Sequence, residues 1–482
     1  MSSMALLSLQ RPPSATAVHR GGVALLWAGL GVGLALLFAL LWRAPGVLPV
    51  LPVLLVGGGA VVYLLGRPLL HLCLTLLASA LILRHEPGVQ VAEVLYGLYC
   101  VFFLAAWTFD EVVLKGRPVF ASRESRALLL FLLLVGALLP LSFFLGGTVH
   151  TVSRELIAIV MLGFFFPIRE ACERYEHGVR VVLLVALALV LFVVFRNLVL
   201  YQTLLSSAEG VWELARGRVI ANDHVLAASS LFALVFVLHA RSARETVGFL
   251  LLLALCFTGL LLTQVRGFWL AFAFGVFFLF VVVEPRRKGH IVLFGGVAAA
   301  LLFVAGTVLF GNLASVFLEG LLDRLMSVQG SLTRDPSLLS RIYESRGALA
   351  RIAENPVLGH GLGVPFSYYD ILTRTTVSST FAHNGYLSLW YRFGVVGAAL
   401  VLYWWARSIG RGLGVYRDRG APLVLRLAGL GAAASLVAFT LSAMTSNPFW
   451  HKDYLFGLAY VAAVACGVRA RASVLRPARA PA

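Results

Sequence analysis

The stretch SSTFAHNGYLSLWYRFGVVG, residues 378–397, carries the chain from a polar loop into an apolar segment. Apolar runs of about 20 residues, the length that crosses a hydrocarbon core of about 30 Å, recur from Gly22 to the C-terminal region. The pattern predicts an all-α polytopic membrane protein. It also leaves His383, followed by Asn384, at the point where one of the expected membrane helices begins.

The composition excludes an ordinary soluble protein. Hydrophobic residues make up 60% of the 482 residues, charged residues 13%, and the mean hydropathy is +0.91. The net charge of +17 is spread over short loops, so a nucleic-acid partner is not expected. The five cysteines show no metal-binding spacing, which argues against a zinc site or a disulfide framework. The first apolar run is too long for a signal-peptide core and is expected to be a retained anchor.

Apolar runs separated by charged residues or by Pro and Gly predict about 12 (12–14) transmembrane helices. The candidate spans lie near residues 22–42, 46–65, 69–83, 91–113, 127–147, 154–168, 181–200, 224–240, 247–265, 268–283, 290–310, 386–406, 423–445 and 454–468. Lys and Arg collect in alternate connections, as they do in cytoplasmic loops. We therefore expect both termini to be cytoplasmic.

This topology predicts five regions and places one long polar segment outside the membrane. The five regions are a cytoplasmic N-terminal tail (1–21), a transmembrane helix bundle (22–310), a large periplasmic loop with the catalytic segment (311–384), C-terminal transmembrane helices (385–468) and a basic cytoplasmic tail (469–482). The periplasmic loop is the long polar segment. The loop contains RDPSLLSRIYESRGALARIAENP, residues 334–356. Asp335 can cap a helix there, Pro336 suits its first turn, and Asn355-Pro356 ends it. Such a long outer segment is expected to carry function.

Three motifs occur in order along this part of the chain. LLLTQVRGFWLAF spans residues 260–272, SRIYESRGALARIAENPVLGHGLG spans 340–363, and the pattern H-N-x9-G-x-x-G runs from His383 to Gly397, where Gly394 and Gly397 would allow close helix packing. Together they resemble the O-antigen ligase family, with its O-antigen polymerase and O-linked oligosaccharyltransferase relatives, over roughly residues 200–450. The chain departs from the family pattern at Val265, usually Ser, and at Ser345, usually an aromatic residue.

The resemblance implies a glycosyltransferase of the GT-C type in a Gram-negative inner membrane, with its active site facing the periplasm. The implied reaction is transfer of O-antigen polysaccharide from an undecaprenyl-pyrophosphate-linked donor to a sugar hydroxyl of the lipid A-core acceptor, without a cofactor. An O-antigen polymerase or an O-linked oligosaccharyltransferase is the nearest alternative. A lipid-linked glycan transporter without catalysis would predict inverted repeats and charges at mid-membrane, whereas the charges here gather at the outer edge.

Attack of a sugar hydroxyl on an anomeric carbon needs a base for the proton and cations for the departing pyrophosphate. Histidine is the natural base at neutral pH, so His383 is the candidate catalytic residue and Asn384 is expected to support it, by orienting the ring or a hydroxyl. Arginines suit the phosphates, and the candidates on the outer side are Arg218, Arg266, Arg341 and Arg346, with Arg216 beside them.

The ordinary alternatives to these roles are an interfacial histidine, a snorkelling Arg266 and simple loop charges at Arg216 and Arg218. Arg341 and Arg346 lie about 140° apart on a helix, so only one is expected to face the site. Arg341 aligns with the family's arginine. The outer-loop carboxylates are scattered and contain no DxD motif, and Asp110-Glu111 is expected on the cytoplasmic side. No metal site is therefore predicted, and the arginines would neutralise the leaving group.

Overall fold

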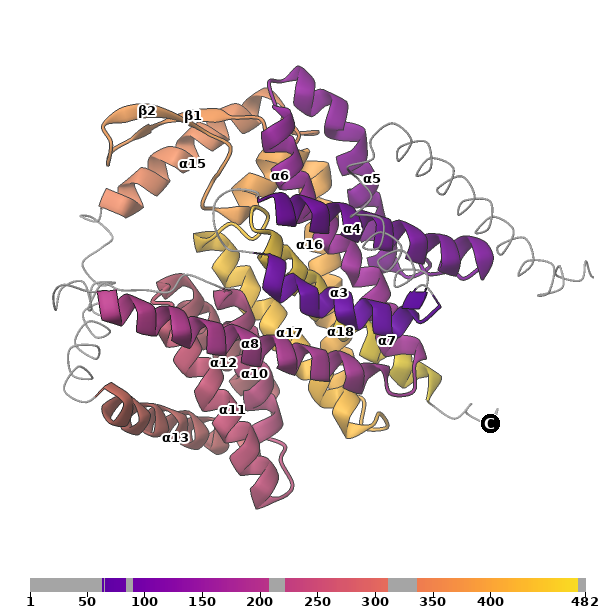
Figure 1. Cartoon of the computed structure of the whole chain (residues 1–482), viewed down its shortest axis with the longest axis vertical. Helices are drawn as coiled ribbons and strands as arrows, with labels where there is room; N and C mark the ends of the chain where they lie inside the picture. The colour runs from indigo at the N-terminus through magenta and orange to yellow at the C-terminus, as the bar shows by residue number, and fades with distance from the viewer. Residues whose placement is uncertain (1–62, 65, 84–89, 208–221, 311–335, 476–482) are drawn as a thin grey trace, which may run out of the picture. The chain divides into compact units, whose positions relative to one another are not determined.

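The computed structural model describes residues 63–475, apart from residue 65 and residues 84–89, 208–221 and 311–335 (Figure 1). The predicted span near 22–42, almost all of the span near 46–65, and the first part of the predicted outer loop lie outside the described residues. So do Arg216 and Arg218.

Every predicted span from residue 69 onward corresponds to helical structure. The helices are α3 Pro68–Ile82, α4 Val91–Thr108, α5 Arg123–Phe144, α6 Val149–Val160, α7 Phe165–Arg174, α8 Gly178–Ser207, α10 Asp223–Val237, α11 Ala243–Leu262, α12 Arg266–Val282, α13 Pro285–Phe310, α15 Pro336–Glu354, α16 Gly385–Tyr416, α17 Leu423–Thr445 and α18 Lys452–Val474. Eight helical segments in the described ranges are long and apolar enough to cross a membrane, and α3, α10 and α12 are shorter apolar helices. The chain is therefore a mostly helical, multi-pass membrane protein. The count of 12 and the GT-C type stay predictions.

The chain separates into two compact units, residues 1–71 with 103–119 and residues 72–102 with 120–482. In the first unit a π-helical segment, Phe109–Leu114, carries Asp110 and Glu111. The Glu111 carboxylate lies 2.7 Å from Lys115 Nζ and 2.5 Å from Arg117 Nη1, and Lys115 also pairs with Asp110. These two carboxylates are thus neutralised by local cations. The following description concerns the second unit.

The core of the second unit is formed by α16, α17 and α18, against which α5, α7, α10 and α12 pack. The helix α17 is rich in Ala and Gly and is mostly buried. Gly412 of α16 faces Gly429 of α17 so closely that a Cβ on Gly412 would lie 2.5 Å from the Gly429 carbonyl oxygen. Small residues allow such close backbone approach between membrane helices.

Connections predicted to lie on one side of the membrane contact each other. At one end Arg411 Nε donates to Glu124 at 3.1 Å, and Arg469 Nη1 lies 3.5 Å from Asp418. At the other end Lys452 Nζ lies 2.6 Å from Glu93. The contacts therefore agree with the grouping of the loops, while the compartment that each side faces stays a prediction.

The described part of the predicted outer loop contains one helix and one β-hairpin (Figure 1). The helix α15 begins at Pro336 and ends at Glu354, which confirms the predicted bounds. The hairpin consists of β1 Phe366–Asp370 and β2 Thr375–Ser379, antiparallel with Phe366 opposite Ser379. The sequence analysis predicted no strand here, so the all-α description holds for the membrane part only. The hairpin lies along α15, where a Cβ on Gly347 would meet the Ser367 carbonyl oxygen at 2.7 Å.

Candidate functional site

His383 lies in the short connection between β2 and α16 and is paired with Glu344 of α15. Its ring Nδ1 is 2.7 Å from Glu344 Oε2, and its backbone N–H donates to Glu344 Oε1. The Glu344 side chain is 3% exposed and the His383 side chain 40% exposed. Because an ionised carboxylate only accepts, Nδ1 is the donor to Glu344, and in the neutral ring Nε2 then keeps a lone pair, with no hydrogen-bond partner among the described residues. A carboxylate that fixes the tautomer in this way prepares histidine to act as a base.

Asn384 is the N-cap of α16. Its Oδ1 accepts hydrogen bonds from the backbone N–H groups of Tyr386 at 3.0 Å and Leu387 at 3.1 Å. The carboxylate that contacts the His383 ring is that of Glu344. The support of the site by Asn384 stays a prediction.

The two candidate arginines of α15 differ in position. Arg341 precedes Glu344 by three residues and so lies beside it on the helix surface. It is half-buried. Arg346 is exposed, and its guanidinium carbon lies 5.6 Å from the centre of the Tyr343 ring. At 3.6 residues per turn Arg346 points about 160° away from Glu344, so the geometry favours Arg341 as the residue nearer to His383.

Arg266 is the half-buried first residue of α12. The next residue, Gly267, is so close to the end of α17 that a Cβ would lie 2.5 Å from Thr445 Oγ1. The loop after α17 in turn meets the start of α16, where a Cβ on Gly385 would lie 2.6 Å from Pro448. The start of α12, the end of α17 and the start of α16 therefore lie together. Arg266 is thus at the same end of the helix bundle as His383. Neither Arg266 nor Arg341 has an ion-pair partner among the described residues.

A buried ion pair, absent from the sequence-based candidates, anchors the segment before His383. Arg392 Nε and Nη2 lie 2.7 and 3.2 Å from the two carboxylate oxygens of Glu155, and the side chains are 2% and 1% exposed. Arg392 Nη2 also donates to the Thr380 carbonyl oxygen at 2.9 Å. One sequence signal could have indicated this pair, because Arg392 is a charge inside an apolar run and needs a partner there.

Gly394 breaks α16 instead of serving helix packing as predicted. Its φ of 63° and ψ of −174° are non-helical, and a Cβ would lie 1.9 Å from the Val357 carbonyl oxygen. The break releases the carbonyls of Tyr391 and Arg392, which accept from His360 N at 2.9 Å and Gly361 N at 2.8 Å. The glycine-rich turn after α15 is therefore joined to α16, and this fixes the frame around His383.

A second histidine, His360, lies in this turn but is not available to substrate. It is 2% exposed and its ring stacks on Tyr391 with centroids 4.9 Å apart. Burial lowers the pKa of His360 below its usual value. The exposed histidine with a carboxylate partner is thus His383.

The chemistry of the site rests on histidine, glutamate and arginine. Within the described ranges no group of three His, Cys, Asp or Glu side chains could hold a metal ion. The Glu344 carboxylate is occupied by His383 and the Glu155 carboxylate by Arg392. That arginines alone meet the charge of a leaving group stays a prediction.

Comparison with known proteins gives one family match over part of the chain. No curated protein matches the chain. Residues 249–402, which include Arg266, Glu344 and His383, match the family model described as O-Antigen ligase (Wzy_C). The match supports an activity of the O-antigen ligase or polymerase type, and with it a glycosyltransferase-type enzyme. It confirms, for this part of the chain, the resemblance to the O-antigen ligase family.

Proposed function

We propose that this protein is an O-antigen ligase, which transfers O-antigen polysaccharide from undecaprenyl pyrophosphate to a sugar hydroxyl of lipid A-core. The reaction would take place on the periplasmic side of a Gram-negative inner membrane. The observation that supports the proposal most is the Glu344–His383 pair, with Nδ1 and Oε2 2.7 Å apart and the ring 40% exposed. It provides a general base at the end of a helix bundle, where a lipid-linked pyrophosphate would lie.

In the proposed step the acceptor hydroxyl gives its proton to His383 Nε2, and its oxygen forms a bond to the anomeric carbon of the donor. The bond between that carbon and the phosphate oxygen breaks, and the pyrophosphate leaves with the electron pair. Glu344 stabilises the imidazolium that forms. Arg266 and Arg341 neutralise the charge that develops on the leaving group. Arg218 lies outside the described residues and Arg346 points away from Glu344, so neither is given a role in this step.

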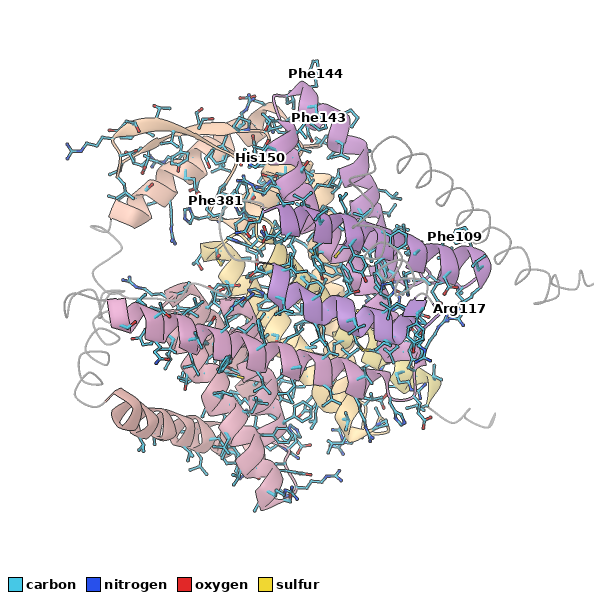
Figure 2. All side chains as sticks on the ribbon, in the orientation of Figure 1. Phe109, Arg117, Phe143, Phe144, His150 and Phe381 are labelled. Atoms are coloured by element: carbon cyan, nitrogen blue, oxygen red, sulfur yellow. The ribbon has the colours of Figure 1, made fainter. Side chains whose placement is uncertain are left out.

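A purified-protein assay with lipid-linked donor and lipid A-core tests the base. His383→Ala is expected to abolish transfer and to leave the protein folded, because the change removes a half-exposed side chain and no core packing. The matched control is His150→Ala, an exposed histidine in the first turn of α6 (Figure 2). If His383→Ala kept near-normal transfer, the base would have to be another group.

Lipopolysaccharide gels of a deletion strain separate the ligase from the polymerase. Loss of a ligase leaves long-chain glycan on its lipid carrier and no O-antigen on lipid A-core. Loss of a polymerase leaves lipopolysaccharide with a single repeat. We expect the first pattern, and the second would replace the ligase assignment by the polymerase.

A further inference from the structure

A polar cavity of about 410 Å³ lies next to the Glu344–His383 pair. It is formed where the turn before α6, the segment after the glycine-rich turn, the end of β2 and the loop between α17 and α18 come together. We name it the Arg154 cavity. Phe381 lines it, and the same ring packs edge-on against His383 with centroids 4.8 Å apart (Figure 2 labels Phe381). A molecule in the cavity would therefore lie beside the proposed base.

The lining of the cavity has the composition of a carbohydrate site. The hydroxyl-bearing residues are Thr148, Thr151, Ser378, Ser379 and Thr380. Two aromatic rings, Phe381 and Trp450, add apolar surface and pack against each other at 5.2 Å. Among these lining residues, all in the described part of the chain, Arg154 is the one charged side chain and no carboxylate occurs.

Arg154 is half-buried and lacks a carboxylate partner in the described residues. Its guanidinium carbon lies 3.9 Å from the centre of the Trp450 ring, and Nη2 donates to Thr380 Oγ1 at 3.1 Å. Its Nε is buried with no hydrogen bond. The neighbouring Glu155 makes no ion pair with Arg154, and its carboxylate binds Arg392 and the Gly363 N–H instead. A guanidinium held in this way between a hydroxyl and an aromatic ring is suited to an anion.

We propose that the Arg154 cavity binds an anionic sugar residue of the acceptor oligosaccharide, one that carries a phosphate or a carboxylate, and that Arg154 selects it. The proposal rests on the proposed function, since it names the acceptor that the site would take. The hydroxyls bind the sugar, the rings support its apolar face, and Arg154 pairs with the anion.

The acceptor is favoured over the donor for two reasons. The base has to contact the acceptor hydroxyl, and the wall of the cavity contacts the base through Phe381. The arginines assigned to the donor pyrophosphate come from other elements, Arg266 from α12 and Arg341 from α15. Arg154, on α6, is therefore left for the other substrate.

Donor-free binding to the purified full chain tests the cavity. The probes are soluble core oligosaccharides with and without phosphate on the sugar that neighbours the accepted hydroxyl. Wild type is expected to bind the phosphorylated form about 10- to 100-fold more tightly, as one charge-assisted contact predicts. Arg154→Gln is expected to remove this preference and to leave binding of undecaprenyl pyrophosphate unchanged. Arg154→Lys should retain part of the preference. Should Arg154→Gln fail to fold, Thr380→Val, which removes the hydroxyl that accepts from Nη2, is expected to reduce the preference severalfold.

The control is Arg374→Gln, which removes one positive charge from the exposed hairpin turn of the same unit. It should leave the preference intact. Equal binding of both oligosaccharides by wild type would overturn the proposal, and so would an Arg154→Gln variant that keeps the preference or loses donor binding instead. The binding assay contains no donor, so its result does not depend on transfer. If wild type shows the preference here but transfers no glycan in the separate transfer assay, the ligase assignment is refuted and the cavity assignment stands.

Discussion

Glu344→Gln removes one charge from the candidate site and almost no volume. Glu344 now accepts two hydrogen bonds from His383, one from its backbone N–H and one from ring Nδ1. Glutamine has one carbonyl oxygen, and because the two donors bind different oxygens of Glu344, the amide NH₂ would face one of them. If the carbonyl oxygen serves the backbone, the amide NH₂ faces Nδ1, and the ring must carry its proton on Nε2. In that tautomer His383 cannot accept a proton from the acceptor.

The two parts of this loss can be estimated separately. Loss of the charge-assisted hydrogen bond to the imidazolium costs about 1.5–3 kcal/mol, or about 10- to 100-fold in rate. The wrong tautomer of His383 lowers the rate further. Replacing the aspartate of a Ser-His-Asp triad by asparagine, which has the same effect on the tautomer, costs about 10⁴ in kcat. We therefore expect Glu344→Gln to lower kcat by about 100- to 10,000-fold with little change in donor affinity.

The assay is glycan transfer by purified protein, with kcat expressed per folded molecule. The matched control is Glu354→Gln at the exposed end of the same helix, which should retain wild-type activity. A double-mutant cycle with His383→Ala gives the decisive result: if Glu344 acts through His383, adding Glu344→Gln to His383→Ala should cost less than about threefold more. The reasoning fails if Glu344→Gln is fully active, or if it costs as much without the histidine as with it.

Arg266→Lys and Arg341→Lys are each expected to lower kcat about 10- to 100-fold, because an ammonium cannot offer two parallel donors to phosphate oxygens. Arg346→Lys is the control and should lower kcat only slightly. The same transfer assay compares all three variants. Turnover is expected to survive EDTA, and loss that magnesium or manganese restores would refute neutralisation by arginine alone. Arg392→Met should destabilise the fold by about 3–5 kcal/mol, measured by thermal unfolding in detergent, because it leaves Glu155 buried without a partner. Gly394→Ala should also lower the unfolding temperature, because its φ of 63° and the adjacent Val357 carbonyl oxygen leave no room for a Cβ.

The helices could be predicted because their signal is local. Apolar runs mark each one, and Pro336 and the Asn355-Pro356 pair fix the ends of α15 within a residue or two. The hairpin also had a local signal, since FSYYD and TTVSS are rich in aromatic and β-branched residues and only the four residues ILTR separate them.

The pairings in the site could not be predicted, because they join residues far apart in sequence. Glu344 and His383 are separated by 39 positions, and Glu155 and Arg392 by 237. Glu344 was one of several scattered loop carboxylates, and only the fold shows that it is the one that lies against the histidine. Asn384, adjacent to the histidine in sequence, is the helix cap, and the ring of His383 is contacted by Glu344 from another helix.

A charged residue next to an apolar run nevertheless allows one prediction from sequence alone: its charge must have a partner. Arg154, Glu155 and Arg392 all meet that description. In the structure Glu155 and Arg392 compensate each other and stabilise the segment before His383, so their charges are explained by the fold. Arg154 has a ring and one hydroxyl but no carboxylate in the described residues, so the fold leaves its charge unexplained. That difference separates a structural ion pair from a candidate ligand site, and it is why the substrate anion is sought at Arg154.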